Sequence, residues 1–253
     1  MRLNASQAIS TPKLLLVPYS AHHVPTYHTW MQDPDLQAAT ASEPLTLKEE
    51  YAMQRSWRED KDKLTFIICL PRANDASAER VLPKVDDARE RMIGDINLFL
   101  FEPDDEDEDD NEVRDIDTPA ATKAVIGEIE LMIARKDLHR QGFGRAALDT
   151  FMNYIIARWP AVYQEFTGHA DGGRRPSLAY LRAKIQQTNV GSVALFESVG
   201  FKRVGSGEPN YFGELELRWH WDGPEPLPDD LKAQSGPLRM LDYHESDIQP
   251  ADH

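Results

Sequence analysis

The order of the expected elements indicates a mixed α/β fold, in which one sheet carries helices on its faces. Apolar runs of strand length outnumber the amphipathic helices, and the two kinds of element do not alternate strictly along the chain. A simple doubly wound sheet requires such alternation and is therefore disfavoured. Hydrophobic residues make up 41% of the 253 residues, which is enough for one sizeable core.

Strands are expected where short apolar runs rich in branched and aromatic residues end at polar or proline positions. The expected strands are residues 14–18, 64–70, 92–101, 125–134, 181–186 and 211–221. The last run is the clearest, because Leu215, Leu217, Trp219 and Trp221 alternate with charged or polar residues. One face of this strand, including both tryptophans, is therefore expected in the core.

Helices are expected at three places. Thr46 and Glu49 form the pattern of a capping box, which predicts a helix that runs to about residue 59. A helix over residues 144–158 follows from apolar residues at spacings of three and four. A short helix over residues 192–199 is expected to stop at Gly200.

The remaining segments are polar, charged or rich in glycine and proline, and they are expected to be loops. Residues 71–90, 102–118 and 159–179 are interpreted as insertions within one domain that covers residues 1–221. Residues 222–253 contain five prolines and no periodicity, which predicts a proline-rich C-terminal tail.

Much of the formal net charge of −15 is local. From Glu102 to Asp117 there are 11 acidic residues and one basic residue, a net of −10, which leaves −15 − (−10) = −5 for the rest of the chain. Nucleic-acid binding needs a basic face and is disfavoured. The acidic run is expected to be a solvated loop, with a basic protein partner as the alternative.

The cellular setting is inferred from cysteine use and from missing membrane signals. Cys69 is the single cysteine, so no internal disulfide can form, which fits a reducing compartment. No apolar run approaches the ~18–20 residues of a membrane-spanning helix, and the first residues lack the apolar stretch of a signal peptide. We expect a cytoplasmic protein that does not bind membranes, and a nuclear location is compatible with the same features.

The segment from His139 to Arg145 has the composition of an anion-binding loop. Gly142 and Gly144 allow the backbone to approach a bulky ligand, and the following helix offers unpaired N–H groups and its positive dipole end. Arg140 and Arg145 can add charge. A Rossmann fingerprint is disfavoured because residues 135–141 separate the glycines from the preceding strand, and a P-loop is excluded because no Gly-Lys-Ser/Thr follows.

This loop resembles the Gln/Arg-x-x-Gly-x-Gly/Ala signature of the GNAT acetyltransferases, which cradles the pyrophosphate of coenzyme A. His139 stands at the Gln/Arg position, which implies weaker cofactor binding rather than loss of the site. A second match, from Asn189 and Ser192 to Gly200-Phe201, resembles the later N-x-x-S…G-F segment of the family. The two matches in this order are much more specific than either alone.

A closer resemblance to the eukaryotic N-acetyltransferase 9-like proteins covers roughly residues 1–221. It is carried by residues 41–47, 50–54, 94–99 and 127–134. The resemblance implies a GNAT-type, mostly antiparallel central sheet of about seven strands flanked by helices. It also implies acetyl-CoA as the co-substrate and a protein or peptide amine as the acceptor.

The resemblance assigns the pyrophosphate loop and the strand that precedes it to cofactor binding. The expected cofactor residues are the backbone of Met132, Ile133 and Ala134, the loop residues His139, Arg140, Gln141, Gly142, Phe143, Gly144 and Arg145, and the later residues Asn189, Ser192 and Phe196. For Asn189 the alternative is a helix cap.

Carboxylates on neighbouring strands are the candidates for the acceptor side. Glu128 and Glu130 share one strand face, and either is expected to accept the amine proton, with Glu130 favoured. Asp95 and Asn97 are candidate residues for the acceptor pocket, the alternative being the wet side of a sheet.

One further departure from the family and two alternative functions remain. Many GNAT enzymes have a tyrosine where Phe196 stands, so the general acid stays unassigned. The eight histidines show no metal-ligand spacing, and no metal site is expected. The leading hypothesis is an N-acetyltransferase that favours N-terminal α-amines over lysine. The alternatives are a catalytically weak GNAT-like binding module and a small-molecule polyamine or aminoglycoside acetyltransferase. The sequence does not predict an oligomeric state.

Overall fold

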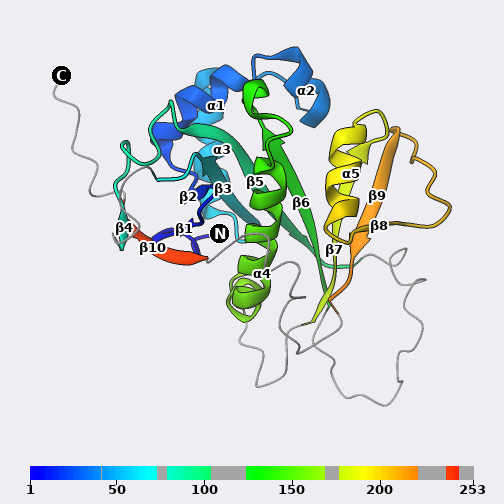
Figure 1. The fold of residues 1–253 in the computed structure, drawn as a ribbon. Coiled ribbons are helices and arrows are strands. Elements are labelled where there is room, and N and C mark those ends of the chain that lie inside the picture. The colour runs from blue at the N-terminus through cyan, green and yellow to red at the C-terminus, as the bar shows by residue number, and fades with distance from the viewer. Residues whose placement is uncertain (41, 73–78, 104–123, 169–176, 222–237, 245–253) are drawn as a thin grey trace.

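The computed structural model describes residues 1–40, 42–72, 79–103, 124–168, 177–221 and 238–244. Its strands form one ten-stranded mixed sheet in the order β4-β10-β1-β2-β3-β5-β6-β7-β9-β8 (Figure 1). Among the described strands, the pairs β6–β7 and β10–β4 are parallel and the others are antiparallel. The strands are β1 (Gln7–Ser10), β2 (Leu15–Pro18), β3 (Lys63–Cys69), β4 (Arg80–Val81), β5 (Met92–Phe101), β6 (Val125–Ile133), β7 (Leu178–Gln186), β8 (Lys202–Arg203), β9 (Glu214–Trp219) and β10 (Arg239–Tyr243).

Helices cover both faces of the sheet. The helical elements are η1 (Ala21–His23), α1 (Val24–Trp30), α2 (Pro34–Thr40), α3 (Leu47–Glu59), η3 (Lys136–Leu138), α4 (Phe143–Thr167) and α5 (Val190–Ser198). The larger core cluster joins one sheet face to α4 and α5, and the smaller cluster joins the other face to α1, α2 and α3. Within the described part of the chain, no helix is both long and apolar enough to span a membrane.

Strand β5 shows how the alternating pattern divides the two layers. Ile96, Leu98 and Leu100 belong to the core beneath α4. Asp95 and Asn97 point to the opposite face, because successive side chains of a strand alternate between faces. Both polar residues are nevertheless buried, at 2% and 4% exposed, since the α1 layer covers that face.

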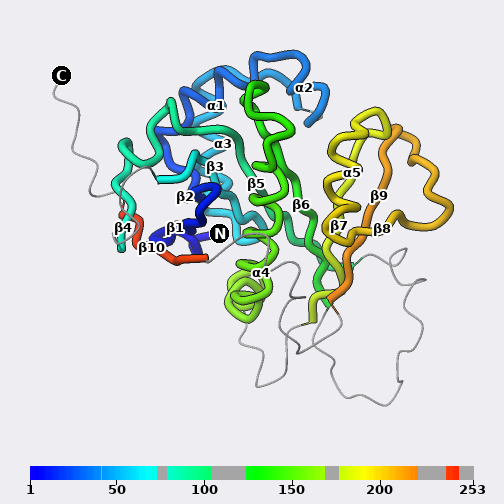
Figure 2. The backbone as a smooth tube through the Cα atoms, in the orientation of Figure 1, coloured from blue at the N-terminus to red at the C-terminus, as the bar shows by residue number. Residues whose placement is uncertain are grey.

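Strands β6 and β7 diverge, and this divergence positions the site. They pair in parallel from Val125 opposite Leu178 to Glu128 opposite Arg182. Beyond that point β6 continues to Ile133 and β7 to Gln186 without described pairing between them. Figure 2 shows the two strands together at one end and apart at the other. On the edge of β6 away from β5, the backbone groups beyond Glu128 therefore face an opening rather than a partner strand.

Two predicted segments differ from the structure. Helix α4 continues past residue 158 to Thr167, so the predicted loop at 159–179 begins later than expected. Pro160 is tolerated because it lies on an exposed side, while Trp159, Val162 and Tyr163 are buried against the core. The predicted tail at 222–253 contains β10, which pairs with β1.

The predicted number of strands was also too low, since β1, β4, β8 and β10 are short and carry little pattern of their own. Strand β9 starts at Glu214, because Tyr211 and Phe212 stand in an exposed turn. The capping box of Thr46 and Glu49 is confirmed at the start of α3. Trp219 lies in the core, and Trp221 packs against it. Most of the acidic run, residues 104–118, lies outside the described residues, so the predicted domain bounds stay predictions.

Candidate active site

The loop between β6 and α4 opens onto a cleft of about 870 Å³. One wall comes from β6 and the loop at the start of α4, and the facing wall comes from α2 and the start of α5. Of the predicted cofactor residues, the wall includes Met132, Ile133, His139, Arg140, Gly142, Phe143, Gly144, Arg145, Asn189, Ser192 and Phe196. The structure thus brings together both sequence motifs, although about 45 residues separate them.

The two glycines of the loop have different physical roles. Gly142 caps α4 with φ +83°, a left-handed conformation, and a Cβ placed there would meet nothing within 4 Å. Gly144 instead permits close packing, because its Cβ would lie 3.2 Å from Leu195 of α5. The first hydrogen bond of α4 runs from the N–H of Ala146 to the carbonyl of Gly142. The N–H groups ahead of Ala146 therefore lack intrahelical partners, and such donors at a helix start are suited to bind an anion.

Most side chains of this loop are committed to structural contacts. His139 Nε2 hydrogen-bonds the carbonyl of Ile133 at 2.7 Å, which ties the loop to the end of β6. Arg145 Nη1 donates to the carbonyl of Ser198 on α5 at 2.9 Å. Phe143 is buried beneath the ammonium of Lys13. Arg145 is thus already engaged, and the backbone N–H groups at the start of α4 are donors that remain for an anion.

Two predicted cofactor residues lie outside the cleft wall. The N–H of Ala134 donates to the carbonyl of Ile93 at 2.8 Å, so strand pairing already uses it. The side-chain amide of Gln141 donates to the carbonyl of Asp137 at 2.7 Å. Both residues support the loop from behind rather than line the cleft.

The predicted helix cap at Asn189 is confirmed, and its cofactor role stays a prediction. Its side-chain Oδ1 accepts from the N–H of Ser192 at 3.2 Å and so caps α5. It also lines the cleft and a second pocket behind it. Phe196 is 3% exposed, packs edge-on against Phe201 with ring centroids 5.0 Å apart, and borders both spaces.

The second pocket, of about 160 Å³, adjoins the cleft and shares with it a wall that includes Met132, Asn189, Ser192 and Phe196. It is lined by four carboxyl side chains, those of Asp95, Glu128, Glu130 and Glu214. A cleft suited to a long anionic ligand thus ends at a small acidic pocket, which suits a cationic amine.

Glu128 and Glu130 differ in their surroundings. Glu128 forms an ion pair with Arg182 at 2.7 Å and lies 4.0 Å from Lys184. The Glu130 side chain is reached by solvent, although protein atoms surround it on most sides. Burial raises the pKa of Glu130 to about 7, with further increases from the charges of Glu128, Asp95 and Glu214. Glu130 is therefore the carboxylate suited to exchange a proton near neutral pH.

Asp95 and Asn97 lie deeper than Glu130. Asp95 stands opposite Met132 in the β5–β6 register, and Asn97 stands opposite Glu130. Asn97 Nδ2 donates to Asp95 Oδ2 at 2.7 Å. Burial raises the pKa of Asp95 to about 7, against hydrogen bonds from Asn97 and Tyr27 that lower it. These buried groups are not the wet side of a sheet.

Comparison with known proteins identifies this arrangement. Residues 13–202 match the family described as Acetyltransferase (GNAT) domain. The chain belongs to the GNAT acetyltransferases. The acetyltransferase is 38% identical over 224 residues to the N-acetyltransferase 9-like protein of Schizosaccharomyces pombe, with 86% of this chain and 97% of the relative covered.

Animal relatives are similarly close. The acetyltransferase is 36% identical to the Alpha/beta-tubulin-N-acetyltransferase 9 of Mus musculus, covering 89% of this chain and 76% of the relative. It is 35% identical to the Homo sapiens protein of the same name, covering 86% and 85%. The chain is thus a member of the N-acetyltransferase 9-like group, as the sequence motifs predicted.

Solved structures agree on the fold. An acetyltransferase of the GNAT family from Bacillus anthracis matches with a TM-score of 0.51 and 12% identity, covering 83% of this chain and 95% of the other. A putative ribosomal-protein-serine acetyltransferase from Vibrio cholerae matches with a TM-score of 0.51 and 14% identity, covering 84% and 96%. At these identities the likeness concerns the fold alone.

Sequence reasoning missed one side of the site. Helix α2 contributes Ala39 and Thr40 to both spaces, and α1 contributes Tyr27 to the acidic pocket. Neither short helix has an apolar stripe long enough to predict. Glu214 was expected only among the charged residues on the wet face of its strand, whereas it lines the acidic pocket beside Gln186, its partner in the β7–β9 register.

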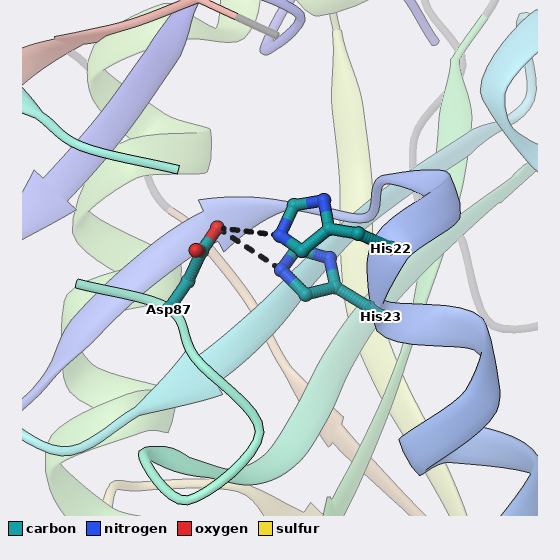
Figure 3. Close-up of side chains that lie close together, drawn as sticks. All are labelled: His22, His23 and Asp87. Atoms are coloured by element: carbon teal, nitrogen blue, oxygen red, sulfur yellow. Dashed lines mark hydrogen bonds and ion pairs between the residues drawn. The ribbon is translucent and has the colours of Figure 1, made fainter. Parts of the chain in front are cut away.

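A cluster outside the active site contains residues of the types that bind metals. His22 Nε2 and His23 Nε2 each lie 3.1 Å from Asp87 Oδ2 (Figure 3). In the described part of the chain these three side chains form a group whose ligand-type atoms lie within 4.8 Å of one another. The sequence analysis did not anticipate it, because 64 residues separate His23 from Asp87.

The hydrogen bonds of the cluster favour a carboxylate held by donors over a metal site. The N–H of Ser20 donates to His23 Nδ1 at 3.0 Å, so the proton of a neutral His23 ring sits on Nε2, which then donates to Asp87. A metal would require the lone pair of that same Nε2. The hydroxyl of Tyr243 adds a further donor to Asp87 Oδ2 at 2.8 Å.

Proposed function

We propose that this acetyltransferase transfers an acetyl group from acetyl-CoA to an amine of a protein or peptide, by direct attack of the amine on the thioester. The observation that carries the proposal is the meeting of the glycine-loop cleft with the acidic pocket at the diverging strand β6. One space suits an anionic, extended donor and the other suits a cationic acceptor. Their shared wall gives the two ligands a place to react.

The residues around the cleft fit coenzyme A. The open space at Gly142 and the unpaired N–H groups of the first turn of α4 suit its pyrophosphate. The unpaired edge of β6 near Met132 and Ile133 suits the amide groups of its pantetheine arm. Asn189 and Ser192 border the same cleft from α5.

Glu130 is proposed to take the proton of the acceptor ammonium, directly or through a water molecule. An α-ammonium has a pKa of ~7.7–8.0 and a lysine ammonium ~10.4. A base whose own pKa is about 7 deprotonates an α-amine far more readily than a lysine. Glu128 is held by Arg182 and is proposed to tune Glu130 rather than to act as the base.

An N-terminal amine of tubulin is the proposed acceptor. Relatives that are 36% and 35% identical over most of this chain carry the name Alpha/beta-tubulin-N-acetyltransferase 9. The acidic pocket supports a cationic acceptor of this kind, although it does not distinguish one polypeptide from another. A tubulin acceptor also fits the expected cytoplasmic location, which we propose on the same basis.

The first experiment measures thermal unfolding with and without acetyl-CoA. At ~100 times its dissociation constant a ligand stabilises the native state by ~2.7 kcal/mol, and we expect a corresponding rise in Tm. Gly142→Leu should abolish that rise by filling the open space of the cleft. Gly205→Leu is the matched control, since Gly205 also has positive φ and open space but lies outside the cleft wall.

The second experiment identifies the acceptor. Peptides with the free N-termini of α- and β-tubulin are compared with the same peptides carrying a blocked N-terminus and an internal lysine, and with spermidine. Release of coenzyme A with the free N-termini alone supports the proposal. Turnover of spermidine alone would replace it with a small-molecule acetyltransferase, and neither binding nor turnover would favour a binding module on this fold.

A further inference from the structure

Asp95 occupies a deep position beside the place where the two ligands meet. Its partner in the β5–β6 register is Met132, which borders both the cleft and the acidic pocket. Asp95 also lines the acidic pocket and is 2% exposed. Glu130 lies two residues along β6, diagonally across from Asp95 and open to solvent.

The hydrogen bonds of Asp95 leave one oxygen without a partner. Oδ2 accepts from Asn97 Nδ2 at 2.7 Å, and the hydroxyl of Tyr27 also hydrogen-bonds this carboxyl group. Oδ1 is buried and has no hydrogen-bond partner among the described residues. In the neutral acid, the proton therefore belongs on Oδ1, where it finds no protein acceptor. A buried donor of this kind calls for an acceptor that a ligand brings.

The departing thiolate of coenzyme A is such an acceptor. Phe196 stands where many relatives place a proton-donating tyrosine, and its ring cannot donate. Tyr27 also lines the acidic pocket, but its hydroxyl is engaged with Asp95. Building on the proposed function, we propose that Asp95 is the general acid of this acetyltransferase and protonates the sulfur of the leaving coenzyme A thiolate.

The reaction balances with one proton for each carboxyl group. Glu130 takes the first proton of the ammonium and later releases it to solvent. The neutral nitrogen attacks the thioester carbon, a C–N bond forms, the C–S bond breaks, and the sulfur keeps the electron pair and takes the proton of Asp95. The nitrogen then passes its surplus proton to the Asp95 carboxylate, which restores the acid. The products are the amide, the thiol of coenzyme A and one proton in solvent.

The surroundings of Asp95 suit an acid that is protonated near neutral pH. The titratable and charged groups that line the acidic pocket with Asp95 are Tyr27, Glu128, Glu130, Lys184 and Glu214, and the charge of Glu50 acts on Tyr27 from α3. Tyr19 also interacts with Asp95 from the segment ahead of η1. Burial raises the pKa of Asp95 to about 7, and the hydrogen bonds from Asn97 and Tyr27 limit that rise. The exposed Glu130 exchanges its proton with solvent, whereas the buried Asp95 retains its own.

The test compares the pH dependence of kcat in the wild type, Asp95→Asn and Asp242→Asn. In the wild type we expect kcat to rise as Glu130 ionises and to fall as Asp95 ionises. Asp95→Asn keeps the shape but lacks the proton, so kcat should fall by on the order of 10²-fold, with the alkaline fall lost and the acetyl-CoA Tm shift retained. Asp242→Asn, the same substitution at an exposed aspartate of β10 outside both pockets, should keep the alkaline fall.

A second variant keeps the test decisive if Asp95→Asn does not fold. Tyr27→Phe removes a hydrogen bond that lowers the pKa of Asp95, so the alkaline fall should move to higher pH. An unchanged alkaline fall in Tyr27→Phe, or in a folded Asp95→Asn, overturns the assignment of Asp95. A wild-type protein that neither binds acetyl-CoA nor releases coenzyme A instead overturns the proposed function, and the two failures are thereby distinguished.

Discussion

Glu128 and Glu130 lie on the same face of one strand, two residues apart, yet their surroundings give them different roles. We expect Glu130→Gln to lower kcat by on the order of 10²-fold with little change in Tm, because it removes the proposed base, whereas the ion pair with Arg182 belongs to Glu128. Glu128→Gln should instead lower Tm, because it leaves the half-buried Arg182 without its carboxylate. Steady-state kinetics and thermal unfolding of the two variants check this, and equal kcat losses would contradict the division of roles.

Gly94 has a packing role that its conformation does not reveal. A Cβ at this position would lie 1.9 Å from the carbonyl oxygen of Met132, on the strand that borders both ligand spaces. We expect Gly94→Ala to force β5 and β6 apart, with a loss of stability of about 2–4 kcal/mol and loss of acetyl-CoA binding. Gly191→Ala on α5 is the control and should be neutral or slightly stabilising. Calorimetric Tm values compare the two variants.

For single residues, the sequence predicts which residue types form the site but not which side chains contact one another. The motif glycines and the alternation of Glu128 and Glu130 are visible in the sequence. The preference for Glu130 acquires a physical cause only from Arg182, which pairs with Glu128 from 54 residues away along the chain. Asp95 was expected in the acceptor pocket, but its unpartnered oxygen depends on the placement of Asn97 and Tyr27.

The cluster of His22, His23 and Asp87 joins three separate elements. Its donors come from η1, from the segment that follows β4 and from Tyr243 on β10. Burial alone would raise the pKa of Asp87, but hydrogen bonds from His22 and His23 outweigh it and hold that pKa well below its usual value. The cluster therefore fastens the start of α1, which carries Tyr27, to the far edge of the sheet.

We expect Asp87→Asn to lower the free energy of unfolding by about 3–5 kcal/mol near pH 7, since it leaves buried donors without their carboxylate. The carboxylate of Asp87 is favoured in the folded state, so its contribution is present above the unfolded pKa of ~3.9 and is lost as the pH falls below it. Urea titrations at pH 7 and at pH 2.5, well below the unfolded pKa, should show the difference between wild type and variant shrinking at the lower pH.

The hydrogen-bond pattern also predicts the response of this cluster to metal. Zinc at micromolar concentration should leave the wild-type Tm unchanged, as should its removal by a chelator, because the Nε2 atom of His23 carries a proton. His23→Ala serves as the control for any zinc response elsewhere. A zinc-dependent rise in Tm that His23→Ala abolishes would show that the cluster is a metal site.

Elements with a strong local signal were predicted well, and elements that depend on distant partners were not. The capping box of Thr46 and Glu49 is entirely local, so α3 follows from the sequence. Helix α4 outlasts its expected end because burial of Trp159 and Val162 outweighs the break that Pro160 suggests. Strand β10 forms by pairing with β1, and its own sequence has no pattern that predicts a strand.

The sheet spans the whole molecule, and its far edge is supplied by residues remote in sequence. Strand β10 lies between β1 and β4, so residues near both ends of the described chain pair directly (Figure 1). We expect truncation after Trp221 to leave the edge of β1 unpaired, to lower Tm by several degrees and to promote association of chains. Truncation after His244 retains β10 and is the control. Equal Tm values for the two truncations would show that β10 contributes nothing to stability.

At the scale of the whole molecule, the fold class and the GNAT resemblance were correct because the two motifs are specific and stand in order. The pairing of β1 with β10, near one edge of the sheet, was not predicted. It requires pairing across more than 200 residues, where sequence pattern carries no information.

Cys69 lies fully buried in β3, away from both ligand spaces, and burial raises the pKa of its thiol well above the usual value. The folded protein therefore presents no reactive sulfhydryl of its own. A chromogenic disulfide reagent can report every thiol that turnover releases, in real time, without a background from the enzyme. Once denaturant is added, the same reagent should count one thiol per chain. One assay therefore measures both the release of product thiol and the unfolding that exposes Cys69.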